Sequence, residues 1–73
     1  MKQSMLKIAL LFTLILGVRD GQLALLETGQ DAPLAVYPQL VSMLPEEDQM
    51  KLTAGIPVRS QIHLAQLLED YLS

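Results

Sequence analysis

The chain contains no cysteine among its 73 residues and only three aromatic side chains, one Phe and two Tyr. The lack of cysteine excludes a disulfide framework and a thiolate metal site, so a domain this small must rely on packing, on a partner or on a membrane for stability. Once the apolar N-terminus is set aside, roughly 50 to 55 residues remain to form a core. The scarcity of aromatic residues predicts that this core is aliphatic.

Positive charge is scarce beyond the N-terminus. Residues 1–19 carry three cations and no acid, whereas residues 20–73 carry all eight acids and only Lys51 and Arg59. The net charge of −3 is therefore the sum of +3 in the first segment and −6 in the second. Nucleic-acid phosphate repels such an acidic body, so we expect no nucleic-acid partner and no helix-turn-helix function.

Residues 1–18 form a hydrophobic segment that resembles a secretory signal or a short membrane anchor. Two lysines precede an uncharged, mostly apolar run from Ile8 to Val18. Eleven residues in a helix rise about 16 Å, less than the roughly 30 Å hydrocarbon core, so the run is a poor spanning helix. Membrane contact through residues 5–18 would place the protein outside the cytoplasm or tether it to a membrane. The alternative is a buried strand within residues 12–18, which would place the protein in the cytoplasm.

Strand patterns follow and partly overlap this segment. An Asp-Gly pair at residues 20–21 lies between two apolar runs and predicts a hairpin over residues 14–26, because both residues tolerate positive φ. Residues 34–41 alternate as a strand, in which Pro38 requires an edge position or a bulge because it has no N–H to donate. We expect a small antiparallel sheet of two or three strands.

Two helices are expected after these strands. The first is predicted over residues 45–53, with Pro at its first position, acids in its first turn and Gly55 as its stop. The second is predicted over residues 61–72, after a cap at Ser60. The extended connector between them can add a third strand. The apolar face of the second helix consists of Leu64, Leu67, Leu68 and Tyr71.

No pattern in the sequence carries recognisable chemistry, and we expect neither enzymatic activity nor a cofactor. A hydrolase built on Ser60 and His63 is one alternative, but their spacing is that of a capping box with His in place of the usual Glu. The acids at residues 46–48 are consecutive on a helix and lack the spaced loop ligands of a calcium site. One histidine without cysteine provides too few ligands for zinc.

Four pieces of the chain form a pattern that extends over residues 16–72. They are Gly-Val at 17–18, Asp-Gly at 20–21, residues 36–44 before the first helix, and residues 52–60 before the amphipathic helix. Together they resemble the C-terminal domain of bypass-of-forespore C proteins of endospore-forming bacteria. The most specific piece is a Gly-Ile-Pro-x-Arg-Ser signature made of Gly55, Ile56, Pro57, Arg59 and Ser60.

The resemblance implies a small α+β domain over residues 14–73 that is non-enzymatic, extracytoplasmic or membrane-tethered, and regulatory. Members of that family act in sporulation signalling between mother cell and forespore, where they restrain a serine protease. The partner implied is therefore another protein, a signalling serine protease. We expect this chain to lack the additional N-terminal domain of those proteins. The alternative is a small single-pass membrane protein that modulates a membrane partner.

Overall fold

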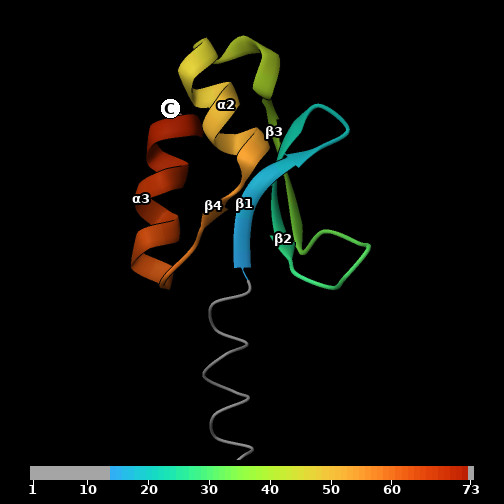
Figure 1. The fold of residues 1–73 in the computed structure, drawn as a ribbon. Coiled ribbons are helices and arrows are strands. Elements are labelled where there is room, and N and C mark those ends of the chain that lie inside the picture. The colour runs from blue at the N-terminus through green and yellow to red at the C-terminus, as the bar shows by residue number, and fades with distance from the viewer. Residues whose placement is uncertain (1–13, 73) are drawn as a thin grey trace, which may run out of the picture.

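The computed structural model describes residues 14–72 (Figure 1). Residues 1–13, on which most of the expected signal or anchor falls, lie outside the described residues, whereas residues 14–18 belong to the first strand. The elements in chain order are β1 (Leu14–Arg19), β2 (Gln22–Glu27), β3 (Ala35–Leu40), the 3₁₀ turn η1 (Val41–Met43), α2 (Glu46–Ala54), β4 (Ile56–Pro57) and α3 (Gln61–Leu72).

The strands form one antiparallel sheet in the order β3-β2-β1-β4. The expected α+β class is confirmed, but the expected number of two or three strands is wrong, because the sheet has four. The connector that was expected to be able to add a strand does so through its Ile-Pro pair, which pairs with Ile15 and Leu16 of β1. Two residues are too short to show a strand period, and they pair only because α2 returns the chain to the edge of β1.

Local backbone preferences explain the hairpin turn and the edge position of β3. Asp20 and Gly21 form the turn between β1 and β2 with φ angles of +52° and +81°, the sign that tight hairpin turns require. Pro38 lies in β3, which is an edge strand, and the pairing of β3 with β2 shifts register between Gln22 and Ala24. An edge and an irregular pairing are the two settings in which a residue without an N–H is tolerated.

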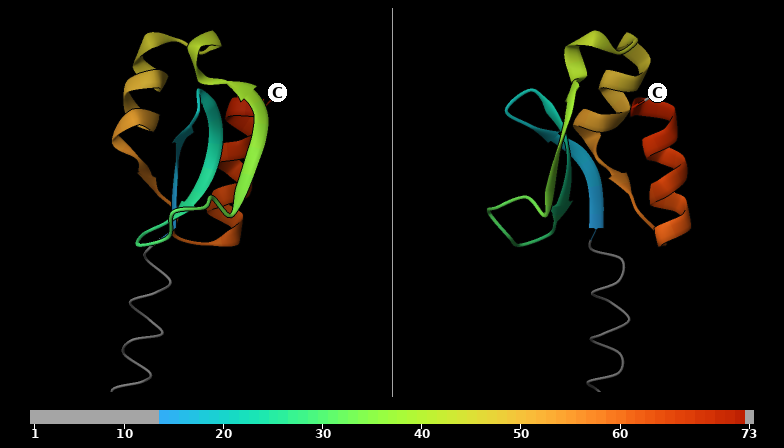
Figure 2. Two further views of the ribbon diagram at one scale, coloured as in Figure 1. Left: turned by 90° about the vertical axis from the view of Figure 1, so that its right-hand side faces the viewer. Right: turned by 180° about the vertical axis from the view of Figure 1, so that it is seen from behind.

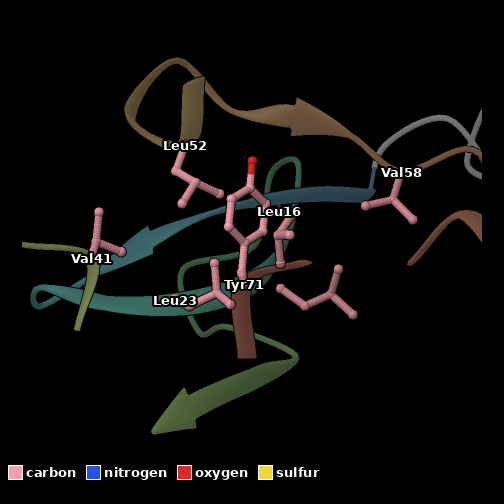
Figure 3. Close-up of a cluster of buried hydrophobic side chains, with 7 residues drawn as sticks. Leu16, Leu23, Val41, Leu52, Val58 and Tyr71 are labelled. Carbon is pink, nitrogen blue, oxygen red and sulfur yellow. The ribbon is translucent and has the colours of Figure 1, made fainter. Parts of the chain in front are cut away.

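Helix α3 covers one face of the sheet, and α2 lies against β1 beside β4 (Figures 1 and 2). The core fills the space between the sheet and the helices and is aliphatic apart from one tyrosine at its centre (Figure 3). Leu16, Leu23 and Leu52 are its most completely buried large side chains. The buried cluster consists of Leu16, Leu23, Leu25, Val41, Leu52, Val58 and Tyr71.

Gly17 of β1 permits the close approach of α2. A Cβ atom at this position would lie 3.3 Å from Leu26 Cδ1 and 3.4 Å from the Leu52 carbonyl oxygen, which is tighter than most Cβ contacts. The absence of a side chain therefore lets the C-terminal half of α2 rest on the strand. The chain leaves α2 beside β1 and then enters β4, which pairs with Ile15 and Leu16 of the same strand.

Candidate interaction surface

The signature residues connect α2 to α3, and the structure gives them roles in the fold. Gly55 ends α2, and its N–H donates to the carbonyl oxygens of Lys51 and Leu52 at 3.0 and 3.1 Å. Its φ of +93° and ψ of +124° belong to a region that residues with a side chain rarely adopt. Ile56 and Pro57 then form β4. This part of the signature therefore stops a helix and adds a strand.

Ser60 and His63 form the start of α3. The Ser60 Oγ accepts the backbone N–H of His63 at 3.0 Å, as expected for an N-cap. The His63 Nδ1 accepts the backbone N–H of Arg59 at 3.1 Å, whereas the third residue of a standard capping box reaches back to the cap residue itself. The hydroxyl and the imidazole are both engaged with backbone groups, and this geometry is that of a helix cap.

Replacement of Ser60 by Ala is expected to lower the free energy of unfolding by about 1 kcal/mol, because the His63 N–H loses its acceptor at the start of α3. Ser60→Asp is the matched control, since a carboxylate can accept the same hydrogen bond and also favours the helix dipole. Urea unfolding followed by circular dichroism measures both variants. Equal destabilisation by Ala and Asp would contradict the capping role.

The predicted apolar face of α3 lies in the core and is not free to bind a partner. Leu64, Leu67 and Leu68 pack against the buried cluster, and Tyr71 belongs to it with 9% exposure. Figure 3 shows the Tyr71 ring among the leucine side chains. Burial raises the pKa of the Tyr71 hydroxyl above its usual value, and the negative charges of Asp48 and Asp70 add to this effect. The folded protein therefore favours the neutral phenol.

The opposite face of the sheet is apolar, and the end of α2 approaches it only at β1, where a Cβ atom at Gly17 would meet the Leu52 carbonyl oxygen. Ile15 pairs with Leu26, and Ala24 pairs with both Gly17 and Val36, so these side chains share the face that points away from α3. In the left-hand view of Figure 2, β2 and β3 lie in front of α3 and no helix covers them on the viewer's side. Ala24 is fully buried, whereas Ile15 and Leu26 are partly exposed. We call the accessible part of this surface, made of Ile15, Leu26, Val36 and Leu40, the open sheet face.

The exposure of the open sheet face is greatest along β3. Val36 and Leu40 are 48% and 51% exposed, and Leu34, in the loop before the strand, is 54% exposed. The intervening residues of β3, which include Tyr37, are less exposed. Two large aliphatic side chains thus project from the edge strand, and a third projects from the loop before it. Contiguous apolar surface of this kind is typical of protein interaction sites.

Two polar side chains border the open sheet face and are engaged with backbone groups. Arg19 pairs with Gln22 at the hairpin end of the face. The Arg19 Nη1 donates to the carbonyl oxygen of Asp31 at 2.7 Å, and the Gln22 Nε2 donates to the carbonyl oxygen of Tyr37 at 3.2 Å. The Arg19 guanidinium therefore reaches from the hairpin end of the face to the loop between β2 and β3, and the Gln22 amide is held against β3.

The sequence did not identify this surface as a site. Residues 34–41 carry apolar side chains on both faces of the strand, so alternation alone does not show which face meets the core. The available signal was the group of aliphatic residues that share the face of Pro38 at an expected sheet edge. Among residues 14–72, the structure shows no cluster of three or more His, Asp or Glu side chains suited to a metal ion. No helix in the same range has the length and apolar character needed to cross a bilayer.

Comparison with known proteins agrees with the resemblance seen in the sequence. The family described as the BofC C-terminal domain matches residues 13–73, a range that includes every described helix and strand. No curated protein and no solved structure matches the chain. The matched range also includes the whole Gly-Ile-Pro-x-Arg-Ser signature at residues 55–60. The chain belongs to the BofC C-terminal domain family.

Proposed function

We propose that this protein is a non-enzymatic regulatory domain that acts by binding another protein through the open sheet face. The observation that supports this proposal is the half-exposed aliphatic surface of β3. One face of a sheet is normally covered by a second layer of structure, as α3 covers the opposite face here. A partner surface would supply the missing layer and would bury Val36 and Leu40 from water.

The charge of the domain indicates the chemistry of that partner. Residues 14–72 contain three cations and eight acids, which gives a net charge of −5. Two copies of the domain would therefore repel each other, whereas a partner with basic residues around an apolar centre would be attracted. We propose a partner surface of that composition. Family resemblance supports a signalling serine protease as the partner and sporulation as the setting.

The proposed location is extracytoplasmic or membrane-tethered, and it rests on the family resemblance and on the apolar N-terminus. The cytoplasm is the alternative, because residues 14–18 form a strand in which Leu16 is fully buried. A small single-pass membrane protein is the second candidate function. The burial of β1 argues against it, since the same residues cannot serve in a sheet and in a membrane helix at one time.

Val36→Asp is expected to weaken binding to the partner by about tenfold or more, because it places a charge at the centre of the apolar contact. Because Val36 is half exposed in the free domain, the substitution should cost little stability, and the thermal midpoint of the variant should remain close to that of the unmodified chain. Ile62→Asp, at a 72% exposed position on α3, is the matched control and should leave binding unchanged.

The binding probe is the purified sporulation-signalling serine protease of the same organism, measured by titration calorimetry and by inhibition of its peptide cleavage. Equal affinity of the Val36→Asp and Ile62→Asp variants would contradict the open sheet face as the site. Concentration-dependent dimerisation in analytical ultracentrifugation would instead identify a second copy as the occupant. A hydrolytic activity of the domain that is lost in His63→Ala would contradict the non-enzymatic role.

A further inference from the structure

Strand β1 uses residues that also belong to the apolar N-terminal run. The uncharged run extends over residues 8–18, and its last five residues lie in β1. Only the six residues 8–13 remain before the strand. A secretory signal needs an apolar region of roughly 7 to 15 residues, and a spanning helix needs about 20. A secretory signal or a spanning helix built on this run therefore requires residues 14–18 in addition.

The sheet requires the same residues. β1 lies between β2 and β4, so its removal would leave β2 paired only with β3. Leu16 is fully buried in the core, and Leu14 and Val18 pack against it. The carbonyl oxygen of Leu14 also accepts the N–H of Val58 at 2.9 Å, which holds the connector that leads to α3. Loss of β1 would therefore open the core on the α3 side and release β4.

We propose that folding of this domain and insertion of its N-terminus into a membrane are mutually exclusive, so that β1 acts as a conformational switch. In the folded protein residues 14–18 form a strand, and in the membrane-bound protein they extend the apolar segment. A small domain without disulfides has modest stability, so a small change in that stability shifts the chain between the two states. This inference concerns the state of the chain and does not depend on the protein partner proposed above.

Two substitutions on α2 test the proposal without altering residues 1–19. Leu52 is 1% exposed and Met50 is 67% exposed, so Leu52→Ala destabilises the fold whereas Met50→Ala is its matched control. The full-length chain is mixed with vesicles of three parts phosphatidylcholine and one part phosphatidylglycerol, and the bound fraction is measured by flotation. We expect Leu52→Ala to raise the ratio of bound to free chain by about tenfold or more, and Met50→Ala to behave as the unmodified chain. Equal binding of all three proteins would overturn the proposal.

A third substitution separates insertion of the N-terminus from general adhesion of an unfolded chain. Leu11→Lys places a charge in the apolar run at a position that precedes β1. In the Leu52→Ala background it is expected to return vesicle binding to the level of the unmodified chain, because a charge in the apolar segment opposes insertion. Undiminished binding would show that exposed core residues cause the association, and the proposal would be wrong.

Hydrogen exchange of the bound chain provides an independent readout. The amides of β2 are expected to be protected in free protein and to lose protection when Leu52→Ala is bound to vesicles, because β2 has lost its pairing with β1. Free Leu52→Ala, measured without vesicles at a temperature where it remains folded, is the reference. Full protection of residues 22–27 in the vesicle-bound chain would show that the sheet and the membrane contact coexist.

Discussion

Replacement of Gly55 by Ala is expected to lower the free energy of unfolding by about 2–4 kcal/mol, through backbone strain and steric overlap together. The backbone at Gly55 has a φ of +93°, where side chains are disfavoured. A Cβ atom built there would lie 2.8 Å from Ile15 Cγ2, a separation that real Cβ atoms essentially never show. Since Ile15 lies on β1 and Gly55 joins α2 to β4, the overlap would force the helix and the strand apart.

Gly29→Ala is the matched control for this prediction. Gly29 also has a positive φ, +86°, but a Cβ atom there would meet nothing within 4 Å. The control should therefore show the conformational cost alone, about 1–2 kcal/mol. Urea unfolding of both variants, followed by circular dichroism, measures the difference. If Gly55→Ala proved no less stable than Gly29→Ala, the contact with Ile15 would not restrict this position.

Truncation of Leu23 to Ala is expected to lower the free energy of unfolding by about 3–4 kcal/mol, because it removes a fully buried side chain and leaves a cavity. The side chain lies on the core face of β2, beside Leu16 and Tyr71 (Figure 3). Small domains often have a total stability of about 5 kcal/mol or less, so the Leu23→Ala protein should retain about 2 kcal/mol or less and be partly unfolded even without denaturant.

Leu40→Ala makes the same chemical change on the opposite face of the sheet. Leu40 is 51% exposed, so the loss should be below about 1 kcal/mol. Thermal unfolding followed in the far ultraviolet compares the two variants. A loss at Leu40 as large as that at Leu23 would mean that the open sheet face is covered in solution, either by a second copy or by another part of the chain.

Strands β1 and β2 are the two central strands of the sheet, and the helices cover the sheet on one face. Gly17 on β1 and Gly55 at the end of α2 both allow the helix to approach the strand, because a Cβ atom at either position would crowd the other element. Because the helices are held in these positions, the open sheet face is left without a helix over β2 and β3. Both helices pack on the core, α2 also contacts β1, and neither lies over β2 and β3 on the outer side (Figure 2).

The sequence by itself determined the elements whose causes are local. The turn at Asp20 and Gly21 depends on positive φ, the start of α3 depends on the Ser60 side chain, and the apolar period of that helix depends on residues three and four apart. Each of these causes acts within a few residues of the chain. Sequence patterns therefore placed the hairpin, the cap and the inward face of α3, and they also indicated the family.

The tertiary structure decided the number of strands and the position of the candidate site, and it decided between the strand and the membrane segment that the sequence left open for residues 14–18. The sequence indicated an extended connector before α3, but its pairing as β4 depends on α2, which brings Ile56 and Pro57 beside β1. The apolar period of residues 14–18 suits a buried strand and a membrane segment equally. Likewise Val36 and Ala35 are both apolar, and only the placement of α3 determines which of them faces water. The physical reason is the same in each case: these features depend on contacts between residues far apart in the chain, and such contacts leave no local signal.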